Sequence, residues 1–224
     1  MIFSILLRKI QRNKEDLGIS LALKKGGLYL LKPIYENRIY RIYGIDLERF
    51  NPLPYADNGL ISKIINASDT QLISQIEKME EWLSGKIMPK LTQGGLCIVA
   101  LDGDKVSGFN LISFGVLFIP LIKMKKFFNK NEAWSEQITV SKDYRGRGLA
   151  TDLRYMVFKE LKNKGIERFY GGTLIDNQAN LKLTRKVGLQ ELVDIHYFKL
   201  FLFEKWKYQP IRDRHEQQIP HPFN

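Results

Sequence analysis

Cysteine and histidine are scarce in this sequence of 224 residues, which contains three histidines and a single cysteine, Cys97. One cysteine cannot form an internal disulfide and supplies no thiol pair for a zinc knuckle. Cys97 also lies in an apolar run, where a buried and unreactive thiol is typical. The sequence therefore predicts no metal site and favours a reducing, cytoplasmic setting.

Long hydrophobic runs are also absent, since no stretch reaches the roughly 20 apolar residues that span a bilayer. The apolar segment 1–7 is followed by Arg8 and Lys9, whereas a signal peptide places its charges first. Two interpretations remain open for residues 1–14. They form an amphipathic helix in peripheral contact with anionic lipid, or a helix that caps the fold or docks on a partner.

Acidic residues are outnumbered, because 35 lysines and arginines face 24 aspartates and glutamates and give a formal charge of +11. This excess makes a large anion a plausible partner. No helix-turn-helix, zinc-finger or RNA-binding motif accompanies the charge, so nucleic acid is not favoured. The basic clusters at 123–130 and 205–214 are equally well read as solvated faces.

The order of apolar patterns predicts a mixed α/β fold in which residues 37–208 form one domain. Residues 1–36 would be an N-terminal extension and residues 209–224 a polar tail. Ser68 and Gln71 resemble a capping box that opens the first helix of the domain. The expected strands are 38–47, 94–101, 106–119, 136–140, 169–175 and 194–206, and the expected helices are 68–85, 149–164 and 178–187.

The segment Tyr144–Ala150, with sequence YRGRGLA, stands where a predicted strand turns into a helix. Successive backbone amides and the helix N-terminus can converge there on one anion, and a phosphate is the natural ligand. Glycine lets the backbone approach phosphate oxygens and adopt positive φ, while the two arginines add charge. The segment lacks the Gly-Lys-Ser/Thr ending of a P-loop and the third glycine of a dinucleotide-binding fold.

In this setting the loop resembles the signature of the GNAT superfamily, which is Gln or Arg, two residues, Gly, one residue, then Gly or Ala. Arg145, Gly148 and Ala150 match that signature. A second resemblance, to the family's later cofactor-contacting helix, runs through Asn177, Asn180, Leu183, Gly188 and Leu189. The likeness covers about residues 94–206. It implies a central mixed, mostly antiparallel sheet flanked by helices, with a V-shaped splay between the fourth and fifth strands.

The resemblance also implies the ligand, which is acetyl-CoA or another acyl-CoA acting as co-substrate. Pantetheine would pair with the backbone near Ile138 and Val140, and Asn177 and Asn180 would contact it. Thr151 would either cap the helix or donate to a phosphate. Lys182, Arg185 and Lys186 would meet a phosphate or form a solvated face. The pyrophosphate would be held by Arg145, Gly146, Arg147, Gly148, Leu149 and Ala150.

The expected catalytic residue is Glu136, because strand alternation places it on one face with Ile138 and Val140. It would take a proton from the attacking amine, although an ion pair with a neighbouring cation is an equally open interpretation. Thr184 stands where many relatives carry the tyrosine that protonates the leaving thiolate. Tyr197 and Tyr170 are distant alternatives for that proton, and His196 is read as structural.

The function predicted from the sequence is direct transfer of an acyl group from CoA to a primary amine in one ternary complex. The acceptor remains open among an amino sugar or nucleotide-linked sugar, a small amine and a protein lysine, and the positive charge favours an anionic acceptor. The competing class is a non-catalytic module that binds acyl-CoA, or a basic module associated with a membrane or nucleic acid. Monomer and dimer are both compatible with the sequence.

Overall fold

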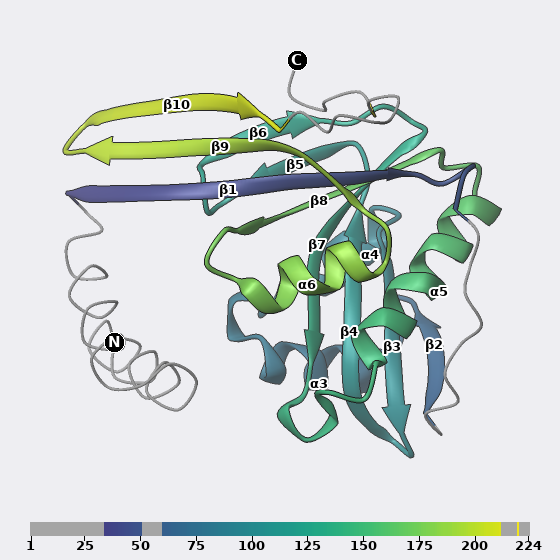
Figure 1. Ribbon diagram of the computed structural model, residues 1–224. Coiled ribbons are helices and arrows are strands. Elements are labelled where there is room, and N and C mark those ends of the chain that lie inside the picture. The colour runs from purple at the N-terminus through teal and green to yellow at the C-terminus, as the bar shows by residue number, and fades with distance from the viewer. Residues whose placement is uncertain (1–33, 51–59, 212–218, 220–224) are drawn as a thin grey trace. The chain divides into compact units, whose positions relative to one another are not determined.

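The computed structural model describes residues 34–50, 60–211 and 219. Helices and strands are interspersed along the chain, and the five strands β3 to β7 follow one another without an intervening helix (Figure 1). The strands are β1 Tyr35–Asp46, β2 Ile61–Ile65, β3 Leu96–Asp102, β4 Lys105–Ser113, β5 Val116–Ile119, β6 Met124–Phe127, β7 Glu132–Val140, β8 Arg168–Leu174, β9 Gln190–Leu200 and β10 Phe203–Pro210. The α-helices are α3 Thr70–Met79, α4 Ile87–Thr92, α5 Leu149–Asn163 and α6 Gln178–Lys186, and 3₁₀ turns span Glu81–Leu83 and Lys142–Tyr144.

Eight strands form one sheet in the order β10-β9-β1-β8-β7-β4-β3-β2, and β5 and β6 form a separate two-stranded sheet. The ladders β2–β3, β3–β4 and β4–β7 are antiparallel, whereas β7–β8 is parallel. This confirms the expected mixed, mostly antiparallel sheet flanked by helices. The described chain divides into two units, with residues 34–40 and 194–209 in the smaller one.

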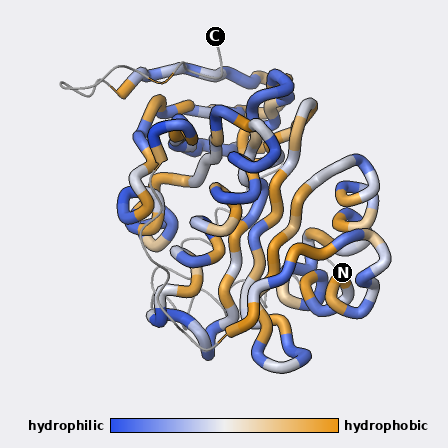
Figure 2. Tube along the Cα trace, turned by 90° about the vertical axis from the view of Figure 1, so that its right-hand side faces the viewer, coloured by the Kyte–Doolittle hydropathy of each residue, from blue (hydrophilic) through white to orange (hydrophobic). Residues whose placement is uncertain are grey.

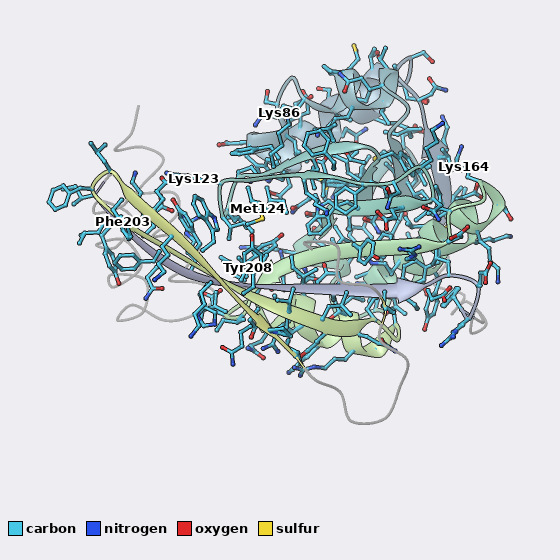
Figure 3. All side chains as sticks on the ribbon, turned by 90° about the horizontal axis from the view of Figure 1, so that it is seen from above. Lys86, Lys123, Met124, Lys164, Phe203 and Tyr208 are labelled. Atoms are coloured by element: carbon cyan, nitrogen blue, oxygen red, sulfur yellow. The ribbon has the colours of Figure 1, made fainter. Side chains whose placement is uncertain are left out.

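The smaller unit contains a hairpin of β9 and β10, where the sequence predicted one continuous strand over 194–206. That prediction is wrong because the chain turns at residues 201–202, with Phe201 at a φ of 52°. The rings of Tyr197 and Trp206 pack against each other in a tilted arrangement across the hairpin, with centroids 5.6 Å apart. The tip is apolar and exposed, with Leu202 at 99% and Phe203 at 61%, and Phe203 is labelled in Figure 3.

The core of the larger unit occupies both faces of the sheet, because alternate residues of β3 point to opposite sides. Leu96, Ile98 and Ala100 join a buried cluster with α5. Cys97 and Val99 join a second cluster with α3 and α4. Figure 1 shows α6 in front of β7 and α5 in front of β3 and β4, and Figure 2 shows the hydrophobic strands between the layers of helices.

The first helix of the larger unit is shorter than the predicted 68–85, since α3 ends at Met79 and a 3₁₀ turn and α4 follow. The predicted capping box is wrong. Asp69 is the N-cap of α3 without a side-chain cap bond, and the Ser68 hydroxyl donates to Oδ1 of Asn66 at 2.6 Å. Asn66 competes for the Ser68 hydroxyl, so the capping geometry does not form.

The predicted long strand 106–119 is also divided, because β4 ends at Ser113 and Gly115 has a φ of 69°. β5 and β6 then form a hairpin, in which Lys123 adopts a φ of 49° beside Met124 (Figure 3). Part of the segment 123–130, expected as a basic loop, is therefore strand β6. Its partner β5 buries Leu117 and Ile119.

Candidate functional site

The glycine-rich loop joins the end of β7 to the start of α5. Gly146 and Gly148 have φ values of 79° and 84°, which L-residues with a Cβ rarely adopt. Gly148 is the N-cap of α5, and its carbonyl accepts from the Thr151 amide at 2.8 Å. Within the described part of the chain, the amides of residues 146–150 donate to no backbone acceptor. The loop thus presents open N–H groups at a helix N-terminus, as an anion site requires.

Cations and an anchored tyrosine surround this loop. The Tyr144 hydroxyl donates to Oδ2 of Asp102 at 2.6 Å, and this carboxylate raises the pKa of the Tyr144 phenol. The guanidinium of Arg147 lies 5.6 Å from the centroid of the Tyr144 ring. Arg145 donates from Nε to the Val140 carbonyl at 3.2 Å. Both arginines are exposed, so their charges are available to a ligand at the loop.

Strands β7 and β8 are paired over only part of their length. Parallel pairing joins 132–135 of β7 to 168–171 of β8, with Ser135 opposite Gly171 as the last pair. Beyond Ser135, β7 continues to Val140 paired with β4 on its other edge. The predicted V-shaped splay is therefore confirmed. The backbone edge at Ile138 and Val140 faces the opening between the two strands.

A β-bulge lies at the apex of this splay. Leu111 of β4 pairs with Gln137 and Ile112 pairs with Ser135, so Glu136 is left without a partner on β4. Such an extra residue interrupts the alternation of side chains along a strand. The sequence placed Glu136 on the same face as Ile138 and Val140, and this placement is wrong for that reason.

The contacts of the β7 side chains show on which face of the sheet each one lies. Ile138 and Val140 pack on the cluster that contains Leu149 and Leu153 of α5. Glu136 instead contacts Lys90 of α4, on the other face of the sheet. The loop for the anion and the carboxylate thus approach the apex of the splay from opposite faces.

Glu136 is held by two neighbours. Nζ of Lys90 lies 2.5 Å from Oε1 of Glu136, and the Ser113 hydroxyl donates to the same oxygen. The side chain of Glu136 is 8% exposed and that of Lys90 is 28% exposed. The ion pair that the sequence left open is present, and the catalytic role of Glu136 stays a prediction.

A second carboxylate, Glu80, lies on the same face of β7 and was missed by the sequence analysis. Glu80 is buried, and its Oε1 accepts from the Thr139 hydroxyl at 2.9 Å and from Gln137 Nε2 at 3.4 Å. No local sequence pattern indicates that Glu80 contacts β7, because Glu80 is simply the residue that follows the last residue of α3. Tertiary packing alone brings it to the splayed half of β7.

Helix α6 supplies the residues of the second family motif. Oδ1 of Asn177 caps the helix by accepting from the Asn180 amide at 3.2 Å. Thr184 is fully buried, and its hydroxyl donates to the Leu181 carbonyl at 2.8 Å. That hydrogen bond occupies the hydroxyl at the position where relatives carry a tyrosine. The alternative donor Tyr197 belongs to the smaller unit, where its hydroxyl bonds to Glu204.

A buried polar cluster lies between the sheet and helices α5 and α6. Its centre is Arg154 of α5, which has no exposed surface and donates from Nη1 to the Ser135 hydroxyl at 2.9 Å. The guanidinium stacks 4.9 Å from the centroid of the Phe169 ring. The Tyr43 phenol lies beside the Arg154 guanidinium and the Asn180 side chain. Burial raises the pKa of the Tyr43 phenol and lowers that of the Arg154 guanidinium.

Several polar atoms of this cluster have no hydrogen-bond partner: Nε and Nη2 of Arg154, Nδ2 of Asn110 and Oδ1 of Asn180. The Ser135 hydroxyl, which accepts from Arg154, lies 3.4 Å from Oδ1 of Asn110. Arg154 was not predicted from the sequence, because a charged residue in an amphipathic helix normally indicates the solvated face.

None of the helices within residues 34–50 and 60–211 is both long and apolar enough to cross a bilayer. In the same part of the chain, no group of three or more histidine, cysteine, aspartate or glutamate side chains is arranged to hold a metal ion.

Comparison with known proteins identifies the family. Residues 63–189 match the sequence profile of the Acetyltransferase (GNAT) family, and the chain therefore belongs to this family. No functionally curated protein matches the chain.

Solved structures share the fold. A GCN5-related N-acetyltransferase from Sphaerobacter thermophilus is 19% identical with a TM-score of 0.52, over 82% of this chain and 56% of its own. A GNAT-family acetyltransferase from Novosphingobium aromaticivorans is 17% identical with a TM-score of 0.51, over 75% and 67%. A fungal region described as a glucosamine N-acetyltransferase is 14% identical with a TM-score of 0.56, over 80% and 23%. The present chain thus spans little more than half of the Sphaerobacter protein.

Proposed function

We propose that this protein is an acyl-CoA-dependent N-acyltransferase that moves an acetyl or other acyl group to a primary amine. The observation that carries the proposal is the position of the glycine-rich loop. Open amides and two exposed arginines lie at the N-terminus of α5, directly after a strand that has parted from its neighbour. This arrangement suits a ligand with a polyanionic head and a long polar arm.

The cofactor would extend from the loop along β7. Its pyrophosphate would bind at residues 145–150, and its pantetheine would pair with the open backbone edge at Val140 and Ile138. Val140 lies five positions after Ser135, which is about 16 Å at the usual rise of a strand. The thioester would then lie near the apex of the splay, between Ser135 and Glu136.

The chemistry would be a direct attack by the amine on the thioester carbonyl. Glu136 would accept the proton released from the attacking nitrogen, and CoA would leave as its thiolate. An acceptor ammonium at this position would replace Lys90 as the partner of Glu136. Because the Thr184 hydroxyl bonds to the helix backbone, the thiolate would obtain its proton elsewhere.

The acceptor would reach Glu136 from the face of the sheet that carries α3 and α4. An amino sugar or another small anionic amine is the acceptor class we favour, since the formal charge of the chain is +11. The fungal protein with a similar fold is described as acting on glucosamine, which is an amino sugar.

Thermal unfolding with CoA, acetyl-CoA and longer acyl-CoAs tests the cofactor assignment. A ligand at about 100 times its Kd adds about 2.7 kcal/mol, a rise in Tm of the order of 5 to 10 °C. Arg147→Glu should abolish this rise. Lys164→Glu is the matched control, because Lys164 stands at the opposite end of α5 (Figure 3) and should leave the rise intact. A cooperative transition that no CoA derivative shifts would refute the proposal.

One observation favours a second candidate, which is binding of acyl-CoA without turnover. Thr184 is buried and bonded to the helix backbone, so α6 offers no acid for the leaving thiolate at this position. Release of free CoA thiol from acyl-CoA in the presence of amines distinguishes the two functions. Amine-dependent release supports the transferase, and binding without release under any amine supports the sensor.

A further inference from the structure

Arg154 is a buried cation without a carboxylate partner in the described part of the chain. Its side chain has no exposed surface, and its neighbours are the Ser135 hydroxyl, the Phe169 ring and the Tyr43 phenol. A buried charge is normally paired, because loss of hydration disfavours the charged form. Because the described residues provide no carboxylate for Arg154, an anion from outside that part of the chain is the partner to look for.

The unpaired atoms of Arg154 define the shape of that anion. Nη1 is occupied by Ser135, whereas Nε and Nη2 have no acceptor. Together Nε and Nη2 form one edge of the planar guanidinium, which presents two parallel N–H groups and fits a carboxylate in a bidentate manner. Nδ2 of Asn110 is a further unpaired donor in the same cluster. These three unpaired donors match a group that accepts hydrogen bonds and donates none, such as a carboxylate.

The position of the cluster indicates which ligand would bring the carboxylate. Ser135, the hydrogen-bond partner of Arg154, is the last residue of β7 that pairs with β8. Arg154 belongs to the same helix that begins at the glycine-rich loop, whereas Glu136 and Lys90 lie on the opposite face. The cluster therefore lies at the acyl end of a cofactor bound along β7, on the cofactor side of the sheet.

We propose that Arg154 binds a carboxylate at the far end of the acyl group, so that the donor is the CoA thioester of a short dicarboxylic acid. This inference rests on the proposed function, since it requires acyl-CoA to occupy the splay. Malonyl, succinyl and glutaryl groups are the chemical class concerned. An unbranched apolar acyl group of the same length leaves the guanidinium edge unpaired and is the poorer ligand.

Binding measured by titration calorimetry tests the inference with pairs matched in chain length. The pairs are malonyl-CoA with propionyl-CoA, succinyl-CoA with butyryl-CoA, and glutaryl-CoA with valeryl-CoA. We expect at least one dicarboxylic thioester to bind ten times or more tightly than its apolar partner. Equal affinity within all three pairs would overturn the inference. That test uses the unmodified protein and does not depend on the folding of a variant.

Arg154→Met then assigns the preference to this side chain, since methionine fills a similar apolar volume without charge. We expect the preference to disappear while CoA itself binds as before. A preserved preference in a folded Arg154→Met protein would overturn the assignment. If the variant does not fold, Ser135→Ala removes the acceptor of Nη1 without removing the charge of Arg154. The ratio of affinities in the pair that shows the preference should then change by at least threefold, and an unchanged ratio would overturn the assignment.

Failure of the inference and failure of the proposed function give different results. If CoA and every thioester leave the heat of titration at the buffer value, the proposed function fails and the inference fails with it. If CoA binds and the two members of each of the three pairs bind with equal affinity, the acyl-CoA site stands and only the carboxylate inference fails.

Discussion

Nζ of Lys90 lies 2.5 Å from Oε1 of Glu136, and this pair connects α4 to the one residue of β7 that the bulge leaves without a partner on β4. The carboxylate is nearly buried, so it depends on Lys90 and Ser113 for compensation. In the proposed reaction the same oxygen must receive a proton from the acceptor amine. Lys90 is thus both a structural partner of Glu136 and a competitor of the substrate.

Glu136→Gln should slow the amine-dependent release of CoA by about 10² to 10⁴, the usual contribution of a general base. Its affinity for acyl-CoA should change less than twofold, because the proposed cofactor site lies on the other face of the sheet. Initial rates and calorimetry on the same preparation measure both quantities. Asp104→Asn, in the β3–β4 turn, is the control for loss of one negative charge. Unchanged rates in Glu136→Gln would remove this residue from the mechanism.

Glu80→Gln tests the neighbouring carboxylate. Glutamine keeps an oxygen that can accept from the Thr139 hydroxyl, so the fold around β7 should persist. We expect a loss of rate well below that of Glu136→Gln. A larger loss in Glu80→Gln, at equal Tm, would transfer the role of base to Glu80.

Lys90→Met should destabilise the protein by about 1 to 3 kcal/mol, since it leaves a nearly buried carboxylate with one partner fewer. Denaturant unfolding measures the change. Combining Lys90→Met with Glu136→Gln should recover part of the loss, because the double variant no longer contains an unpaired charge. Strictly additive losses would show that the two side chains are not coupled.

Gly148→Ala should cost about 1 to 2 kcal/mol, because alanine is strained at a φ of 84°. An added Cβ would meet no atom within 4 Å, so the cost is conformational rather than steric. The variant should also lose acyl-CoA binding as the loop relaxes. Gly103→Ala, at a φ of 56° in the β3–β4 turn, should lose similar stability and retain binding. Loss of binding in both variants would indicate a general effect of unfolding.

Cys97 predicts a specific response to alkaline pH. Burial raises the pKa of its thiol from 9.0 to about 12. Above pH 9 the unfolded thiol ionises while the folded one keeps its proton, so unfolding releases a proton and stability falls. The slope contributed by this group is at most about 1.4 kcal/mol per pH unit and should vanish in Cys97→Ala. Denaturant unfolding of the unmodified protein and of Cys97→Ala between pH 8 and 10 tests this prediction. An equal change in the free energy of unfolding of both proteins would contradict it.

The parts of the site that the sequence predicted carry strong local signals. The glycines of the loop stand where positive φ is needed, and the apolar period from Leu149 to Leu161 defines α5. These signals act within a few residues. They therefore indicated the loop and the helix without knowledge of the tertiary structure.

The remaining features depend on long-range contacts. The bulge at Glu136 is a mismatch between β7 and β4, which neither strand encodes alone. Glu80 and Arg154 become part of the site only because distant elements pack on β7. The turn at Phe201 contains neither glycine nor asparagine, the residues that usually mark a hairpin.

The bulge in β7 has a consequence for how this enzyme family could diverge. The face on which Glu136 emerges is set by the number of residues between Ser135 and Gln137 and not by their identities, since their partners Ile112 and Leu111 are adjacent. Deleting this one residue would restore regular pairing, remove the carboxylate and keep the glycine loop in frame. Under the proposed mechanism, a single codon deletion would thus turn an acyltransferase into a protein that binds acyl-CoA without turnover.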